Sequence, residues 1–276
     1  MIPQAYLTQW GVGAPWPTAA QVEQDLILSR MIVEIANDPL LGAELAFRGG
    51  TCLHKLHLPT AYRYSEDLDY VRTGTEPKLG EIYDALRAIA AGIGLTEHRR
   101  KFPGTSDMGS IWFNAEPTAG GRIRIKVETN VAATEPFTPR ITLPYRVESR
   151  WWSGSAHVPS FQLEELLATK LRALYQRNKA RDLFDLWIAL RTLDIDDQAV
   201  VSGLAHYMGA ALYSYPQLAA NLNAKLNHRP FLDDLAQLVG TPPDGYDPPT
   251  AGALVLDRLG RHLGTPPPGP DHPTRR

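Results

Sequence analysis

The sequence contains one cysteine, Cys52, so no disulfide can form within the chain, which is consistent with a reducing compartment. It contains no run of about 18 apolar residues, and we therefore expect no membrane-spanning helix. The first residues, MIPQAYLTQWGVGAPWP, lack the basic and then apolar pattern of a secretory signal. The sequence therefore predicts a soluble protein of the cytoplasm, without a membrane partner.

The sequence also lacks a strong excess of either charge. The formal net charge is −2 and the pI is about 6.4, so the protein as a whole is not a polycation. Any contact with nucleic acid must come from a local basic face. The length of 276 residues and the hydrophobic fraction of 43% are those of an ordinary globular protein with a sizeable core.

The pattern of apolar residues divides the chain into a mixed first half and a helical second half. After a loop-like start, Thr18 is a candidate N-cap for a helix over residues 19–38. We therefore expect an α+β region over residues 1–150, a helical region over residues 151–262, and a disordered Pro-rich tail over residues 263–276. In the first region we expect strands over residues 44–50, 62–72, 95–102, 110–116, 122–131 and 140–148, and helices over residues 51–58 and 77–94.

Two glycines, Gly49 and Gly50, lie between a predicted strand and a predicted helix. Glycine allows a sharp turn and a close approach by a ligand, and the following helix offers unpaired N–H groups to an anion. Thr51 could cap that helix, contact a phosphate, or do both. A plain turn between a strand and a helix explains the same residues.

Asp67 and Asp69 point to the same side of the next predicted strand, with Cα atoms about 6.5–7 Å apart. Two such carboxylates can hold Mg²⁺ or Mn²⁺, which prefer oxygen ligands. On their own, the two aspartates are more simply explained by an edge strand with a solvent-exposed face. The segment RIRIKVETNV alternates strictly, and its charged face ends at Glu128, which would stand beside the two aspartates if the two strands were neighbours. Three carboxylates around a metal pair are typical of phosphoryl and nucleotidyl transfer.

A lysine lies on the apolar face of a later predicted helix. Lys170 falls within the arc of leucines in LEELLATKLRAL, where it must extend to solvent, pair with an acid, or bind a ligand. Arg177 and Arg181 follow close to the same line, and Asp182 and Asp185 share one side of the next helix. A solvated basic helix and a triphosphate site both explain this segment.

Together, FRGGTCLHKLHL…RYSEDLDYV and ELLATKLRALYQRNKARDLFDLW resemble the signatures of the AbiEii-type toxins, which include the MenT group. That family belongs to the nucleotidyltransferase superfamily with the DNA polymerase β-like fold. The resemblance runs from about residue 20 to residue 190. It implies a mixed sheet with flanking helices, followed by a helical part that completes the active site.

The resemblance also implies roles for individual residues. Gly49, Gly50 and Thr51 would hold the nucleotide phosphates, with Ser65 beside the metal. Asp67 and Asp69 would bind a catalytic Mg²⁺ or Mn²⁺, and Glu128 occupies the place of the third carboxylate. In the helical part, Lys170 would neutralise the triphosphate with Arg177 and Arg181 nearby, and Asp182 would complete the site.

The implied reaction moves NMP from an NTP to an acceptor hydroxyl, with loss of pyrophosphate. The implied acceptor is RNA, in particular the tRNA 3′ end, so that translation stops, and the implied partner is a cognate antitoxin. The basic segment KLRALYQRNKAR, with Arg122, Arg124 and Lys126, is where we expect the RNA backbone and the triphosphate. Transfer of the γ-phosphate on the same scaffold, or non-catalytic binding of NTP or RNA, remain alternatives.

Two further residue types have simpler explanations. His54 and His57 are spaced for zinc, but without a nearby Cys or acid we expect them on a helix surface. Cys52 has no visible activating base, and we expect it to be a packing residue.

Overall fold

The computed structural model describes residues 2–60, 62–104, 107–118, 120–132, 135–236, 238–239 and 243–264. The chain forms two compact units, Met1–Leu166 with Ala236–Pro243, and Leu167–Leu235 with Asp244–Arg276. The division expected after residue 150 falls inside the first unit. The predicted tail lies outside the described residues from residue 265 onward. Within the described residues, no helix has the combined length and hydropathy needed to cross a membrane.

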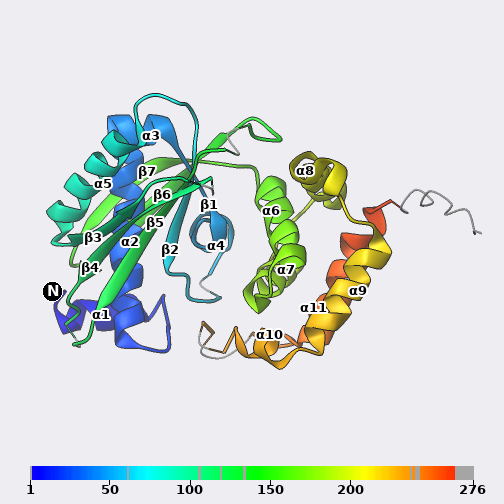
Figure 1. The fold of residues 1–276 in the computed structure, drawn as a ribbon. Coiled ribbons are helices and arrows are strands. Elements are labelled where there is room, and N and C mark those ends of the chain that lie inside the picture. Colours follow the sequence, from blue (N-terminus) through cyan, green and yellow to red (C-terminus); the bar gives the residue numbers. More distant parts are fainter. Residues whose placement is uncertain are drawn as a thin grey trace, which may run out of the picture. The chain divides into compact units, whose positions relative to one another are not determined.

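All strands of the described residues lie in the first unit, as the sequence predicts (Figure 1). Its elements are α1 (Gln4–Gly11), α2 (Ala19–Asn37), α3 (Pro39–Glu44), β1 (Leu45–Arg48), α4 (Gly49–Cys52), the π-helix η1 (Leu53–His57), β2 (Asp67–Arg72), α5 (Leu79–Ile93), β3 (Thr96–Lys101), β4 (Met108–Ala115), β5 (Ile123–Asn130), β6 (Ile141–Glu148) and β7 (Ser153–Ser160). Helix α6 (Leu163–Gln176) begins in this unit.

Three expectations about this unit need correction. The first segment, expected to be a loop, contains helix α1. The strand expected over residues 62–72 begins only at Asp67. Strand β7 was not expected, because SGSAHVPS has few of the β-branched and aromatic residues that favour strands. Its pairing with β6 over its whole length supplies what its composition lacks.

The five-stranded sheet is mixed, in the order β1-β2-β5-β4-β3. Strands β2 and β5 are parallel neighbours at its centre, and the other neighbours are antiparallel. On β5, Ile123, Ile125 and Val127 are buried, whereas Arg124 is exposed and Lys126 and Glu128 are half-buried. The predicted alternation of β5 is therefore confirmed, and one face of the sheet is apolar and the other polar.

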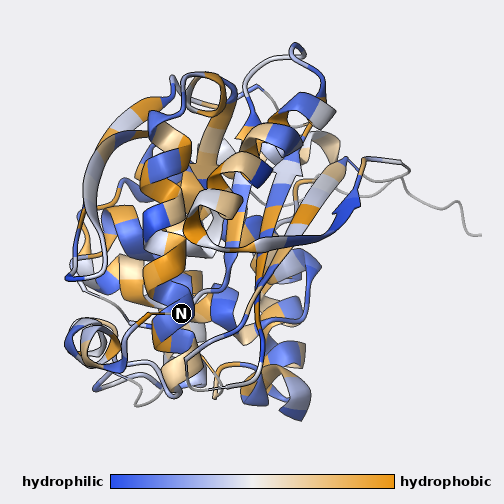
Figure 2. Cartoon of the chain, turned by 90° about the vertical axis from the view of Figure 1, so that its left-hand side faces the viewer, coloured by the Kyte–Doolittle hydropathy of each residue, from blue (hydrophilic) through white to orange (hydrophobic). Residues whose placement is uncertain are grey.

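Helices α2, α3 and α5 contact one another and cover the apolar face of the sheet (Figure 1). Thr18 caps α2 as predicted, because its hydroxyl accepts from the backbone N–H of Gln21 while the Gln21 side chain accepts from Thr18 N–H. Figure 2 shows both hydrophobic and hydrophilic residues on the helices, as expected for amphipathic helices with one apolar face. Leu26, Leu86 and Phe113 belong to the core between these layers.

The second unit is helical, as the sequence predicts. It contains the rest of α6 and then α7 (Ala180–Thr192), α8 (Asp197–Met208), the 3-10 helix η2 (Gly209–Ala211), α9 (Tyr215–Leu226), α10 (Arg229–Asp233), α11 (Pro248–Arg258) and the 3-10 helix η3 (Gly260–His262). Helix α11 contacts both α7 and α9. Phe184 and Trp187 of α7 are buried against Tyr246, which precedes α11.

Candidate active site

The first glycine of the pair lies directly against an aspartate of the neighbouring strand. Gly49 has a φ of +85°, in the left-handed region that favours glycine. A Cβ at this position would meet Asp69 Oδ2 at 2.2 Å. Both observations require glycine here, because any side chain would be strained and would displace the Asp69 carboxylate. The turn from β1 into α4 is therefore shaped around Asp69.

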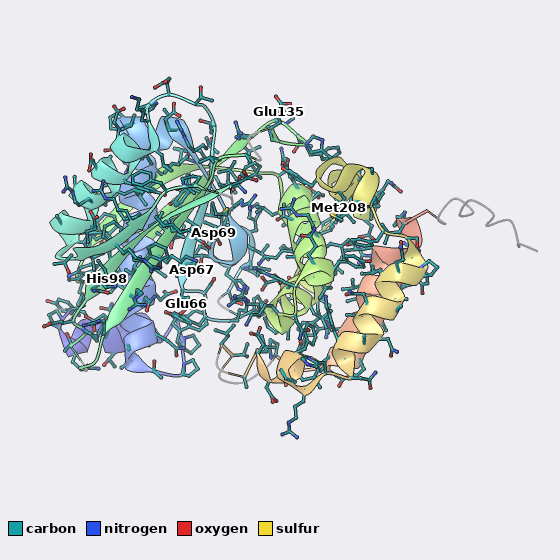
Figure 3. All side chains as sticks on the ribbon, in the orientation of Figure 1. Glu66, Asp67, Asp69, His98, Glu135 and Met208 are labelled. Atoms are coloured by element: carbon teal, nitrogen blue, oxygen red, sulfur yellow. The ribbon has the colours of Figure 1, made fainter. Side chains whose placement is uncertain are left out.

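Asp67 and Asp69 lie on the polar face of β2, close together and half-buried (Figure 3). Leu68, between them, is fully buried on the apolar face. The register of the parallel pair sets Asp67 opposite Lys126 and Asp69 opposite Glu128. The two strands are thus neighbours, which is the condition that places three carboxylates on one face.

Electrostatic repulsion and burial act together on Asp67. Burial raises the pKa of its carboxyl group, the Asp69 carboxylate raises it further, and the result is about 7 although Lys126 lowers it. A bound cation would offset both the burial and the repulsion. The donor set of two adjacent carboxylates therefore fits a hard divalent ion such as Mg²⁺.

The third carboxylate has a different partner in this structure. Glu128 Oε1 lies 2.7 Å from Lys126 Nζ and 3.5 Å from Ser110 Oγ. Among the described residues, no group of three or more His, Cys, Asp or Glu side chains is arranged to hold a metal ion. The structure thus offers Asp67 and Asp69 for a cation, while the role of Glu128 as a ligand stays a prediction.

Thr51 holds the start of β2. Its Oγ1 lies 2.6 Å from the backbone oxygen of Asp67, to which it can only donate, and 2.8 Å from Ser65 Oγ. The residue is 1% exposed. Of the roles considered for Thr51, capping of the helix is excluded, because the N-cap of α4 is Arg48 and no side chain caps it. Thr51 instead fixes the backbone that carries Asp67, with Ser65 beside it.

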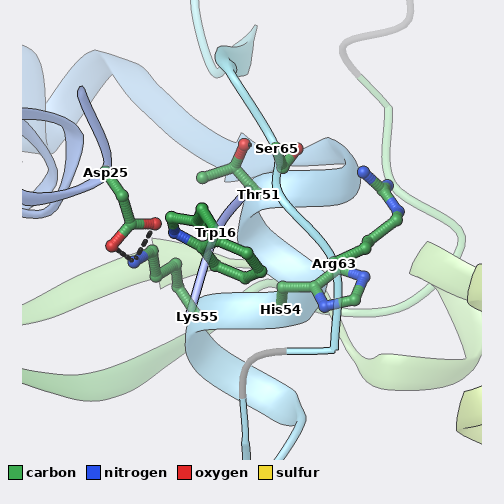
Figure 4. A pocket seen from close by; sticks show the side chains of 7 residues that line it. All are labelled: Trp16, Asp25, Thr51, His54, Lys55, Arg63 and Ser65. Atoms are coloured by element: carbon green, nitrogen blue, oxygen red, sulfur yellow. Dashed lines mark hydrogen bonds and ion pairs between the residues drawn. The ribbon is translucent and has the colours of Figure 1, made fainter. Parts of the chain in front are cut away.

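A small pocket adjoins these hydroxyls (Figure 4). Its volume of about 20 Å³ is enough for a water molecule and too small for a nucleotide. At its wall, Lys55 Nζ lies 2.7 Å from Asp25, which also accepts from Trp10 Nε1 at 2.9 Å. Burial lowers the pKa of Lys55, but the Asp25 carboxylate and Tyr145 together outweigh burial and leave the pKa raised. Residues that line the pocket are Trp16, Asp25, Thr51, His54, Lys55, Arg63 and Ser65.

The expected surface position of the two histidines is wrong. His54 is buried and lines this pocket, and His57 is half-buried. Burial lowers the pKa of His57 to about 4, so it is neutral at pH 7. Cys52 is fully buried, as expected for a packing residue. No pattern in the sequence signals burial of the histidines, because η1 widens to a π-helix and changes the face that each side chain occupies.

The second unit builds a buried cluster of charges around the inward lysine. Lys170 is 6% exposed, and its Nζ lies 2.8 Å from Asp185 Oδ2 and 3.6 Å from Asp182 Oδ1. Both aspartates are fully buried. Arg177 donates to both oxygens of Asp182, at 2.6 and 2.8 Å. Of the three possibilities for Lys170, the structure shows pairing with acids.

A further lysine, which the sequence pattern did not single out, joins this region. Lys225 of α9 is 9% exposed and donates to the carbonyl oxygens of Leu174 and Tyr175 near the end of α6. Burial lowers its pKa to about 8, although Asp182 raises it. Arg181 is half-buried on α7, and its predicted contact with the nucleotide stays a prediction.

Each unit thus brings its own set of predicted residues together. Asp67, Asp69 and Glu128 share one sheet face, and the β1–α4 turn lies against it. Lys170, Arg177 and Asp182 form one ion-pair cluster. Within the first set are Gly49, Gly50, Thr51, Ser65, Asp67, Asp69 and Glu128, and within the second are Lys170, Arg177, Arg181 and Asp182.

The comparisons with known proteins identify a family and a similar fold. The family model described as nucleotidyl transferase AbiEii toxin, type IV toxin–antitoxin system, matches residues 30–254. No curated protein sequence matches the chain. Among solved structures, MenT4, a nucleotidyltransferase toxin from Mycobacterium tuberculosis H37Rv, has a similar fold, with a TM-score of 0.62 and 18% identity over 95% of this chain and 90% of that chain. Since the family model covers most of its length, the chain belongs to the AbiEii nucleotidyltransferase toxin family.

Proposed function

We propose that the protein is a metal-dependent nucleotidyltransferase toxin that moves NMP from an NTP to an RNA acceptor, in particular the tRNA 3′ end, and so blocks translation. Membership of the AbiEii family supports the reaction class. The observation that carries the proposal is the polar sheet face on which Asp67 and Asp69 stand side by side, with Glu128 in register. An ordinary solvated strand would not need a turn built around one of its carboxylates, as Gly49 is around Asp69.

In this reaction the acceptor hydroxyl oxygen bonds to the α-phosphorus, and the bond from that phosphorus to the bridging oxygen of pyrophosphate breaks. Asp67 and Asp69 would hold a Mg²⁺ or Mn²⁺ that stabilises charge on the phosphates and lowers the pKa of the hydroxyl. Glu128 is the third carboxylate of the face, and we assign one of its oxygens as the acceptor of the hydroxyl proton. Thr51 keeps the Asp67 backbone in place throughout.

The second unit would supply positive charge for the leaving pyrophosphate. Lys170 is held by two buried aspartates, so its ammonium group is fixed before any ligand arrives. Arg177 is bound to Asp182 on one side and exposed on the other, with 48% of its side chain accessible. We propose that these two cations, with Arg181, contact the triphosphate.

The family description also supports a partner. A toxin of a toxin–antitoxin system is encoded with a protein or regulator that opposes it, and we propose a cognate antitoxin for this chain. We place the reaction in the cytoplasm, where tRNA and NTP are found together.

The decisive experiment is a transfer assay with each of the four α-³²P NTPs, Mg²⁺ or Mn²⁺, and total RNA. The matched control is Asp67→Ala. We expect label in a tRNA-sized band with the wild-type protein and none with the variant. Label on protein would keep the chemistry but change the acceptor. Label moved only from γ-³²P ATP would replace the proposal with phosphotransfer, and binding without any transfer would leave a non-catalytic protein.

A further inference from the structure

The polar face of the sheet continues from the aspartates toward the β3 edge as a row of basic and aromatic side chains. The strand registers set Asp67 opposite Lys126, Lys126 opposite Trp112, and Trp112 opposite Arg99. Two strand spacings separate Asp67 from Trp112, which is about 10 Å between backbones. The row thus runs directly across the sheet from the proposed reaction centre.

Trp112 is not explained by core packing. Among the described residues, Trp10, Trp16, Trp151 and Trp152 pack against the hydrophobic core of this unit, but Trp112 does not. Trp112 is half-buried on the polar face, where the Arg99 guanidinium lies 4.0 Å from its ring centroid and Lys126 Nζ lies 5.9 Å away. A large aromatic ring on the polar side of a sheet, flanked by cations, is the arrangement on which nucleic-acid bases stack.

The charge around Trp112 is complementary to a phosphate backbone. Arg99, Lys101 and Arg124 are exposed. Lys101 is opposite Ser110, which is opposite Glu128, so Lys101 shares the polar face. Arg124 shares it through the alternation of β5. The cations lie on β3 and β5, the two strands that flank β4. This spread is wider than one mononucleotide can use, whereas a strand of RNA carries one phosphate for each base.

We infer that Trp112, with Arg99 and Lys126 beside it, stacks a base of a single-stranded RNA segment that lies across β5, β4 and β3. We identify this RNA as the acceptor of the proposed nucleotidyl transfer, and this part of the inference rests on the proposed function. The binding itself needs no metal and no turnover, because stacking and phosphate contacts act on the RNA alone.

The test measures binding of a fluorescein-labelled single-stranded RNA by fluorescence anisotropy in the presence of EDTA. The RNA is about 12 nucleotides long, which is within the usual site sizes. We expect Trp112→Leu to raise Kd about 5-fold or more, and Trp112→Phe, which keeps an aromatic ring, to have a much smaller effect. Arg99→Gln should also weaken binding and reduce the salt slope by about one.

Two control variants lie outside this face. Trp151→Leu removes another half-buried indole that has an arginine, Arg30, 5.0 Å from its ring. Arg87→Gln removes a charge from α5, where the side chain is 57% exposed. Both should bind the RNA as the wild type does. Thermal unfolding of Trp112→Leu and Trp112→Phe separates loss of the fold from loss of stacking.

Three results would overturn the inference. These are wild-type protein that does not bind the RNA, a folded Trp112→Leu variant with unchanged Kd, and controls that lose as much affinity. Unchanged RNA binding with a raised KM for NTP would assign the ring to the nucleotide base instead. If RNA binding depends on Trp112 but no NMP is transferred, the surface stands and the proposed reaction fails.

Discussion

Gly49 and Asp69 occupy adjoining space so closely that a single methyl group on the glycine would overlap the carboxylate, at 2.2 Å from Asp69 Oδ2. Gly49 therefore has two separate functions: it adopts a left-handed backbone conformation, and it leaves room for the Asp69 carboxylate. Substitutions can separate the two, because Gly94 has a left-handed backbone without a neighbouring carboxylate.

We predict that Gly49→Ala removes transfer activity. It should also lower the free energy of unfolding by more than about 1–2 kcal/mol, which is the cost of placing a non-glycine residue in the left-handed conformation. The added methyl group displaces Asp69 as well as straining the turn. Gly94 is the matched control, because its φ is +87° and a Cβ there would meet no atom of the described residues within 4 Å. Gly94→Ala should lose stability and keep activity, and equal activity in the two variants would contradict the proposed role of the turn.

Removal of either β2 aspartate should abolish transfer while the fold survives. For Asp67→Asn and Asp69→Asn we expect kcat to fall by more than about 100-fold. Substitution of groups that only orient a metal ligand typically lowers activity by about 10–100-fold. Asp84→Asn, at a 56% exposed side chain on α5, is the control. Activity should be measured by NMP transfer and by growth after expression. Near-normal transfer by either β2 variant would remove the metal assignment.

The pKa of Asp67 predicts a change of stability with pH. Folding raises this pKa from 3.8 to about 7. Between pH 3.8 and about pH 7, the folded protein therefore keeps a proton on Asp67 that the unfolded chain has already released. In metal-free protein, this group therefore lowers the free energy of unfolding as pH rises from about 4 to about 7. Asp67→Asn should raise Tm at pH 8 and have little effect at pH 4. Thermal unfolding in EDTA checks this, and an equal shift at both pH values would refute the electrostatic cause.

Thr51 offers a test of positioning by one hydroxyl. Thr51→Val keeps the shape but leaves the Asp67 carbonyl without its donor, which costs about 1–3 kcal/mol. Thr51→Ser keeps the donor and should retain most of the stability and activity. Chemical unfolding and NMP transfer measure the two effects. If valine and serine behaved alike, the hydrogen bond would not be what holds the start of β2.

The buried lysine of the second unit should matter for stability as well as for NTP use. Lys170→Met removes a positive charge that offsets the buried negative charges of Asp182 and Asp185. We therefore expect the free energy of unfolding to fall by about 3–5 kcal/mol. Lys179→Met breaks an ion pair at a 46% exposed lysine and should cost less than about 1 kcal/mol. Urea unfolding compares them. Equal losses would show that burial does not strengthen the Lys170 pairs.

Much of the architecture follows from local patterns. The alternation in β5 identifies its two faces, and the Thr18 cap and Gly94 identify the ends of two helices. These signals are local because they depend on backbone geometry within a few residues. Helix α1 and strand β7 lack such signals, since one lies in a Pro/Gly-rich segment and the other has small polar residues that only a partner strand stabilises.

The candidate site was predictable in part for the same reason. Alternation places Asp67 and Asp69 on one face, but the position of Glu128 beside them depends on which strands pair, and residues far apart in the chain decide that. The ion pairs of Lys170 likewise need the turn between α6 and α7. The burial of His54, and the Asp25–Lys55 pair at the pocket, come from packing that no spacing in the sequence reports.

The parallel pairing of β2 with β5 has a consequence for the order of events during synthesis. A chain that has emerged from the ribosome only as far as α5 already carries Asp67 and Asp69, but β2 then has β1 as its single neighbour. The acidic face is completed when β5 arrives and inserts between β2 and β4. Such long-range parallel pairing is slow to form. A nascent or truncated chain that ends before β5 lacks Glu128 and the strand that completes this face, and we therefore expect it to have no transfer activity.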